Sequence, residues 1–271
     1  MGLLIRNATA ILTGLPGAQA RHAGPDIRVS GSRIEAIGQL APLPGEPQID
    51  ATDCVVYPAW VNTHHHLFQS LLKGDPFGIN ATLMATGTGI AHCPQSNGRL
   101  GSGIAPVRAL EEAGAAVSIG VDGAASNEAA DMLSETHAAW LMQRARAGEA
   151  AVALYRGGQG EAQAAAAATV EDVVRWGTAG GAKVLGLPAV GTLDVGQAVD
   201  IAVYSLAHDP RYFGLHDPAI GPVASGGAAH LKTLLVAGRE VVRDGAIAGL
   251  DLAAPGREAR TAVAKIIAAV A

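Results

Sequence analysis

The stretch Asn62-Thr63-His64-His65-His66-Leu67-Phe68-Gln69 follows an apolar run over residues 54–61 that is typical of a buried strand. Three histidines therefore stand where a strand ends. Because side chains alternate across a strand, His64 and His66 point to one side and His65 to the other. Two imidazoles on one wall of a cavity are typical ligands of zinc or iron. Taken alone, the pair is explained equally well by a solvated turn or by histidines hydrogen-bonded in a core.

Two later strands also end in groups that could act as ligands. Residues 87–92 and 116–121 are the predicted strands, and residues 106–113 between them predict a helix that stops at Gly114. A strand, a helix and a strand with short connections predict a right-handed parallel unit. Ligands bind at the carboxyl ends of strands in such units. The side chains expected at these ends are His64, His66, His92 and Asp122.

The composition is that of a soluble globular protein. The chain has 271 residues, of which 49% are hydrophobic and 16% charged, and this length is sufficient for one large domain or two modest ones. The net charge of -5, with scattered lysines and arginines, argues against nucleic-acid binding. No glycine-rich phosphate loop follows a strand, which disfavours a nucleotide-binding module.

Membrane and secretory signals are not found in the sequence. It contains no run of eighteen or more apolar residues, and its N-terminus lacks the basic-then-apolar order of a signal peptide. The only cysteines are Cys54 and Cys93, so we expect reduced thiols. The predicted location is the cytoplasm, without a membrane partner.

The two ends of the chain share a β-rich pattern. Short alternating runs at residues 3–14, 26–38, 198–204 and 234–242 are each too short to bury a face alone, so we expect them to form one β-sandwich. Residues 256–270 predict a terminal helix packed on the outside.

Helix signals occur in the middle of the chain. Residues 127–146 predict a helix with Ser126 as its N-cap, and Thr169 with Asp172 predicts a capping box for a helix that Gly186 ends. The loop at residues 208–218 contains two His-Asp-Pro triplets. It is suited to closing over a site, although turn chemistry accounts for it equally well.

Three motifs, at residues 58–69, 91–97 and 118–123, resemble the amidohydrolase superfamily, in particular its cytosine-deaminase-like and triazine-aminohydrolase branch. The stretch 214–218 resembles the 8-oxoguanine and isoxanthopterin deaminases more narrowly. The resemblance spans both chain ends, with the motifs in the family's order. It implies an α/β fold: a (β/α) TIM-type barrel in residues 58–187, a composite β-sandwich from residues 1–57 and 188–255, and a C-terminal helix over 256–271.

The resemblance also implies a site with one divalent metal ion, zinc in the first place and iron as the other candidate. Its metal ligands would be His64, His66 and Asp122, and Asp122 would also take a proton from water. The residues implied on the substrate side are Gln69, His92, Ser96 and Asn97. Hydroxide then attacks a ring carbon that bears an amino group, and ammonia leaves.

This chain departs from the family between His66 and His92. The family places most of the barrel there, with a further ligand histidine, a catalytic glutamate that protonates the ring and a histidine that orients water. None of these can be assigned in this chain, so we expect a partial barrel that lacks several central βα units. Three explanations stay open: an internal deletion, a half-barrel completed by another chain, or a sequence that lacks part of a longer protein.

Two functions follow from these observations. The first is a metal-dependent aminohydrolase that acts on C-N bonds in a small purine- or pterin-like heterocycle, as a homo-oligomer. The alternative is a catalytically impaired remnant that acts as a metal-binding or structural oligomer partner, since the glutamate and two histidines are absent.

Overall fold

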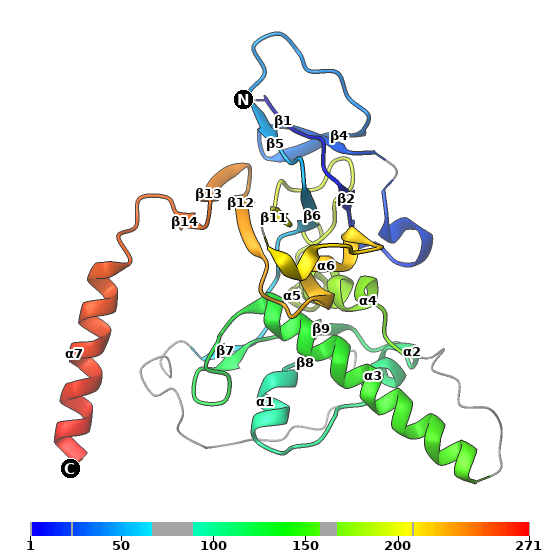
Figure 1. Ribbon diagram of the computed structural model, residues 1–271, viewed down its shortest axis with the longest axis vertical. Coiled ribbons are helices and arrows are strands. Elements are labelled where there is room, and N and C mark those ends of the chain that lie inside the picture. Colours follow the sequence, from blue (N-terminus) through cyan, green and yellow to red (C-terminus); the bar gives the residue numbers. More distant parts are fainter. Residues whose placement is uncertain (1, 23, 67–88, 158–166, 208, 271) are drawn as a thin grey trace.

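The computed structural model describes residues 2–22, 24–66, 89–157, 167–207 and 209–270, and it has a mixed α/β fold, as predicted (Figure 1). A four-stranded sheet lies at the top of Figure 1, a six-stranded sheet lies below it, and parallel strands with helices lie at the bottom. The helices that the structure describes include none long and apolar enough to cross a membrane.

The four-stranded sheet is built from the first 50 residues. Its strands, in spatial order, are β4 (Arg33–Gly38), β3 (Asp26–Ser30), β1 (Gly2–Arg6) and β5 (Gln48–Asp50). The 3-10 helix η1 (Gly17–Ala20) lies between β2 (Ala10–Ile11) and β3 in sequence.

The six-stranded sheet combines strands from both ends of the chain. Its strands, in spatial order, are β14 (Ala246–Ile247), β13 (Arg239–Arg243), β12 (His230–Val236), β11 (Ile201–Ser205), β6 (Cys54–Pro58) and β2 (Ala10–Ile11). β6 pairs antiparallel with β11, although nearly 150 residues separate them in sequence.

Strands β6 and β11 of the six-stranded sheet are buried on both faces because their alternate side chains enter different cores. Val56, Ile201 and Val203 pack with residues of the four-stranded sheet, such as Ile27. The intervening side chains, among them Tyr57 and Tyr204, pack against the helices and parallel strands. A strand that is covered on both faces has a continuous apolar sequence, and residues 54–58 have that pattern.

Four short parallel strands lie on the side of the six-stranded sheet to which Tyr57 and Tyr204 point. They are β7 (His65–His66), β8 (Ile90–His92), β9 (Val117–Ile119) and β10 (Asp122–Gly123). β8 pairs with β9 and β10 pairs with β7, in both cases parallel. β10 begins three residues after β9 ends, so the segment from Val117 to Gly123 joins the two pairs.

The helices around these strands are α1 (Pro94–Arg99), α2 (Val107–Glu112), α3 (Met132–Arg156), α4 (Val170–Arg175), a π-helical turn (Trp176–Gly180), α5 (Gly181–Leu185) and α6 (Gly221–Ala224), with 3-10 helices η5 (Pro210–Tyr212) and η6 (Pro218–Ile220). The predicted capping box of Thr169 and Asp172 is confirmed at α4, and Gly186 ends α5 with a φ of 68°.

The predicted start of the long helix was wrong. α3 begins at Met132, because the carboxylate of Asp131 accepts the backbone N–H groups of Leu133 and Ser134. Ser126, the expected cap, lies outside the helix. Ala130, just before the cap, has a φ of 46°, which is not helical.

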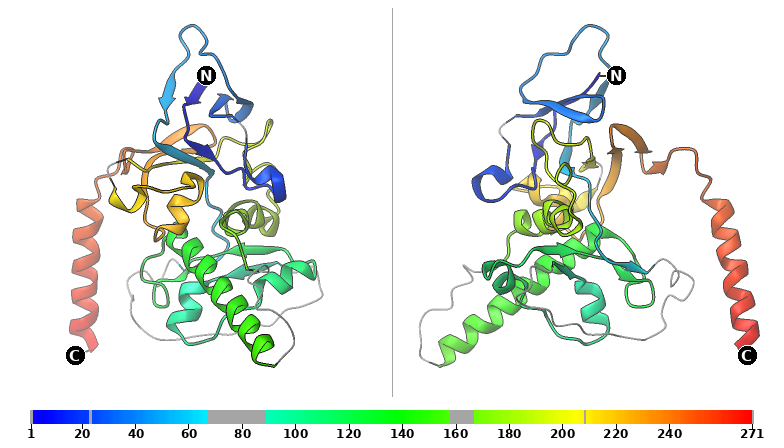
Figure 2. Two further views of the ribbon diagram at one scale, coloured as in Figure 1. Left: turned by 45° about the vertical axis from the view of Figure 1, so that its right-hand side comes forward. Right: turned by 180° about the vertical axis from the view of Figure 1, so that it is seen from behind.

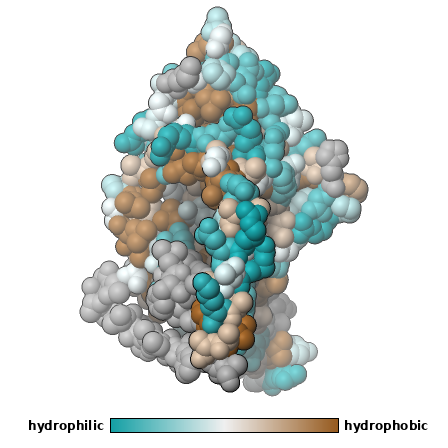
Figure 3. All heavy atoms as spheres, turned by 90° about the vertical axis from the view of Figure 1, so that its left-hand side faces the viewer, coloured by the Kyte–Doolittle hydropathy of each residue, from teal (hydrophilic) through white to brown (hydrophobic). Residues whose placement is uncertain are grey.

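The C-terminal helix α7 (Ala253–Val270) forms as predicted but does not lie against the rest of the molecule as expected. It stands apart from the rest of the molecule in the opposite views of Figures 1 and 2, and most of its described residues are exposed. Figure 3 views the molecule from the side of this helix and shows hydrophobic residues gathered beside it. The sequence predicts a helix packed on the outside of the body, and the structure differs in this respect.

We expect Tyr57→Phe to lower the free energy of unfolding by about 1–2 kcal/mol. The hydroxyl of buried Tyr57 donates to the backbone carbonyl of Ala219 at 2.6 Å, and the substitution leaves that buried carbonyl without this partner. Urea denaturation measures the change. Tyr155→Phe is the matched control, since Tyr155 is 67% exposed, and an equal loss in both variants would contradict the prediction.

Candidate functional site

His64 and Asp122 lie together where two neighbouring parallel strands meet. Asp122 pairs with His65 in the register of β10 and β7, and its backbone N–H donates to the carbonyl of His64 at 2.9 Å. The side chains also meet, with His64 Nε2 3.1 Å from Asp122 Oδ1. The His64 side chain is 45% exposed and that of Asp122 is 22% exposed, so the pair is open to solvent on one side.

The carboxylate of Asp122 is held by three further donors. Ser96 and Ser126 donate their hydroxyls to Oδ2 at 2.6 and 3.0 Å, and the backbone N–H of Gly123 donates to Oδ1 at 2.7 Å. Burial acts to raise the pKa of Asp122, but these hydrogen bonds and nearby His64 outweigh it and lower the pKa below its ordinary value. Asp122 is therefore ionised at neutral pH.

The backbone of Asp122 is also unusual. Its φ is 61°, in the left-handed region that residues with a side chain rarely adopt. Such a conformation costs free energy and persists only where neighbouring contacts enforce it. Here the pairing with β7 and the bonds from both serines hold it.

The other predicted metal ligand, His66, is placed by its backbone alone. It pairs with Gly123 in the sheet of β7 and β10, and its side chain lies outside the described residues. Gln69 also lies outside the described residues. The half-buried Asn97 is in α1, where its backbone N–H donates to Cys93.

His92 is enclosed in the protein at the end of β8. It is only 2% exposed, and neither ring nitrogen has a hydrogen-bond partner among the described residues. Burial lowers its pKa to about 4, so the ring is neutral at pH 7. A neutral imidazole offers one donor and one acceptor, and the described residues satisfy neither.

Two polar residues of this region were not identified from the sequence. Ser126 was expected to cap a helix, whereas its hydroxyl contacts Asp122; its position four residues after the aspartate was the available signal. Glu135, in the first turn of α3, is fully buried, and burial raises its pKa to about 8. Nothing in the sequence distinguishes it from an exposed helical glutamate.

The donors of this region suit a metal ion. An imidazole nitrogen of His64 and a carboxylate oxygen of Asp122 face each other, and both types of atom are common zinc ligands. Within the described part of the chain, no three His, Cys, Asp or Glu residues are grouped closely enough to hold an ion. A third ligand on β7 would come from His66, which follows His64 by two residues.

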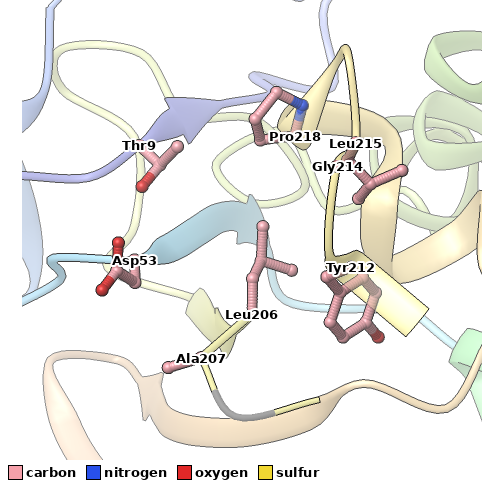
Figure 4. A pocket seen from close by; sticks show the side chains of 8 residues that line it. All are labelled: Thr9, Asp53, Leu206, Ala207, Tyr212, Gly214, Leu215 and Pro218. Atoms are coloured by element: carbon pink, nitrogen blue, oxygen red, sulfur yellow. The ribbon is translucent and has the colours of Figure 1, made fainter. Parts of the chain in front are cut away.

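The loop with two His-Asp-Pro triplets lies elsewhere. Described residues of that loop, including Tyr212 and Leu215, line a pocket of about 230 Å³ with Asp53 and Leu206 (Figure 4). This pocket contains none of the predicted site residues. The structure therefore gives no support to closure of this loop over the site.

Comparisons with known proteins identify amidohydrolases and deaminases as relatives of this chain. The amidohydrolase family profile matches residues 78–241. An isoxanthopterin deaminase from an unknown prokaryotic organism is 36% identical over a 469-residue alignment that covers 97% of each chain. Because this chain has 271 residues, the alignment contains long stretches of the relative without a counterpart here. An 8-oxoguanine deaminase of Pseudomonas aeruginosa is 40% identical over 182 residues, which are 67% of this chain and 36% of that enzyme.

Solved structures share the fold. An amidohydrolase from an environmental sample of the Sargasso Sea is 35% identical, with a TM-score of 0.84 and coverage of 100% of both chains. Atrazine chlorohydrolase TrzN of Arthrobacter aurescens TC1, solved with zinc, has a TM-score of 0.80 over 96% of this chain and 100% of its own. At 16% identity, that second likeness concerns the fold alone.

We expect His92 to make the protein less stable in acid. The unfolded chain binds a proton at the histidine near pH 6.5, whereas the folded protein binds it only near pH 4, so stability falls as the pH drops through that window. The loss attributable to His92 is up to about 3 kcal/mol. Urea denaturation between pH 7 and pH 4 measures it. His92→Asn should reduce the pH dependence and exposed His230→Asn should not; equal slopes in all three proteins would contradict the prediction.

Proposed function

Because the chain belongs to the amidohydrolase family, we propose that it is a metal-dependent deaminase that replaces a ring amino group by oxygen and releases ammonia. The observation that carries this proposal is the contact of His64, directly before β7, with Asp122 of the adjacent parallel strand β10, whose carboxylate is held by two serines. The substrate we propose is a purine- or pterin-like heterocycle. Relatives named as isoxanthopterin and 8-oxoguanine deaminases support that class.

We assign His64, His66 and Asp122 as the ligands of one divalent ion, zinc first and iron as the other candidate. An ion bound there supplies hydroxide at neutral pH. The lowered pKa of Asp122 keeps its carboxylate ionised, so it can accept a proton from the attacking water. The hydroxyls of Ser96 and Ser126 and the backbone N–H of Gly123 would hold the carboxylate in one orientation while it takes that proton.

We place the heterocycle beside His92, Asn97 and Gln69. The two free nitrogens of His92 support this assignment, because a ring with amino and carbonyl groups presents both donors and acceptors. Ser96 donates to Asp122, so a contact with substrate would add to that role.

We further propose the domain organisation that the family implies. Residues 58–187 would form a partial TIM-type barrel that lacks central βα units, and residues 1–57 and 188–255 a composite β-sandwich, followed by a helix over 256–271. The parallel pairs β7–β10 and β8–β9 support the first assignment, and the core shared by the two sheets supports the second. The alignment with the isoxanthopterin deaminase, which is 469 residues long, supports a chain that is shorter than this relative.

We also propose that copies of the chain associate and that the protein is cytoplasmic. Among the described residues the parallel strands form only two-stranded pairs, and such short pairs gain stability from a neighbouring strand, which favours a homo-oligomer. Both cysteines are free thiols, as expected in a reducing compartment. The alternative of an impaired remnant gains no support from the relatives, which are named as deaminases and hydrolases.

We expect the purified chain to bind about one zinc ion and the double variant His64→Ala/His66→Ala to bind almost none, because two of three ligands are removed. Metal content after dialysis is measured by plasma emission spectroscopy. The control is His230→Ala, which removes an exposed imidazole of β12. Unchanged metal content in the double variant would show that the ligands lie elsewhere.

We expect ammonia release from at least one of guanine, 8-oxoguanine and isoxanthopterin, and slower release from cytosine, whose single ring fills less of a site for fused rings. Asp122→Asn should reduce the rate by about 100-fold or more, since an amide cannot take the proton. A coupled ammonia assay provides the measurement. Equal rates for wild type and Asp122→Asn would refute the role of Asp122, and no release from any of the four compounds would refute the activity.

A further inference from the structure

Glu135 is a buried carboxyl group that the proposed reaction does not use. It is 0% exposed and lies in the first turn of α3, on the side that faces α1 and the segment after β10. Burial of a carboxyl group is costly unless its oxygens are hydrogen-bonded. The hydrogen-bond donors to Glu135 therefore indicate its role.

Each oxygen of Glu135 accepts a hydrogen bond from a different segment. Oε1 accepts the backbone N–H of Gln95 at 3.1 Å, and Oε2 accepts the side-chain amide of Asn127 at 2.8 Å. The adjacent Ser134 strengthens the first link, because its hydroxyl oxygen accepts the side-chain amide of Gln95 at 2.9 Å. One helical turn thus ties the start of α1 to the turn that follows β10.

Both partners of Glu135 are sequence neighbours of a serine that holds Asp122. Gln95 precedes Ser96, and Asn127 follows Ser126; the two serine hydroxyls donate to the same oxygen of Asp122. Asn127 is itself fixed, because its Oδ1 accepts the backbone N–H groups of Ala129 and Ala130. Displacement of either segment would move one of these hydroxyls.

We propose that Glu135 is a positioning residue for the metal site: it clamps the segments of Ser96 and Ser126 so that both hydroxyls hold the Asp122 carboxylate. This inference rests on the proposed function, because that function makes Asp122 a metal ligand. The hydrogen bonds of Glu135 to the two segments do not depend on the metal. Burial also raises the pKa of Glu135, so the clamp is largely neutral at pH 7 and adds little negative charge beside Asp122.

The first test is the zinc affinity of the full chain. We expect Glu135→Ala to weaken it about 10-fold, the lower end of the usual effect of an outer-shell partner. Glu135→Gln keeps the size of the side chain but only one acceptor oxygen, and its amide N–H would face the other donor, so its affinity should lie between those of wild type and Glu135→Ala. Glu149→Ala, at an exposed position of the same helix, should leave affinity unchanged. Wild-type affinity in Glu135→Ala would overturn the proposal.

A double-mutant cycle separates positioning from a general structural role. In a Ser96→Ala/Ser126→Ala background the hydroxyls are gone, so Glu135→Ala should weaken zinc binding no further. An equal 10-fold loss in both backgrounds would mean that Glu135 acts by another route. If Glu135→Ala does not fold, Glu135→Asp, which is one methylene too short to reach both donors, replaces it in every comparison.

A metal-free readout distinguishes failure of this inference from failure of the proposed function. If the wild-type chain binds no zinc, the proposed metal site is wrong, and the crystal structure of Glu135→Ala decides the clamp. We expect at least one serine hydroxyl to lie beyond hydrogen-bond distance of Asp122 Oδ2. Both hydroxyls at their present 2.6 and 3.0 Å would overturn the clamp whatever the metal result.

Discussion

The pairing of β6 with β11 is the constraint on which the rest of the structure depends. These strands come from distant parts of the chain, and alternate side chains bury one face against the four-stranded sheet and the other against the helices. β6 also leads directly toward the histidines. Trp60, just after it, donates its indole N–H to the hydroxyl of Tyr204 on β11 at 2.7 Å. The direction in which the chain enters the site is therefore set by the core.

The candidate site combines a strained backbone with a satisfied carboxylate. Asp122 adopts a left-handed conformation, yet each of its carboxylate oxygens accepts at least one hydrogen bond. These two features are connected, because the same serines and backbone amide that lower its pKa also hold the strained geometry. Ionisation and orientation of this group thus depend on segments that come before and after it in sequence.

The features that were predicted correctly from the sequence are those that neighbouring residues determine, such as helix caps and helix ends. Thr169 and Asp172 form the expected capping box, Gly186 ends its helix, and the expected strands place His64 beside Asp122. Ser126 was misassigned because a serine before a helix is equally suited to a cap and to a tertiary contact, and Asp131 provided the better cap. The burial of Glu135 depends on packing between segments, which no single stretch of sequence reveals.

Under the proposed domain assignment, the contact of His64 with Asp122 shows how these two residues can meet in a barrel that lacks its central units. In a closed barrel the first and last strands are neighbours, so residues at their ends meet without help from the strands between. Under the proposed assignment, β7 belongs to the first strand and β10 to the last, and they pair in register here. Loss of central units removes groups that those units carry. Under that assignment, loss of the central units would leave the pair of strands beside which His64 and Asp122 lie, and the proposed clamp by Glu135 would act on the last strand.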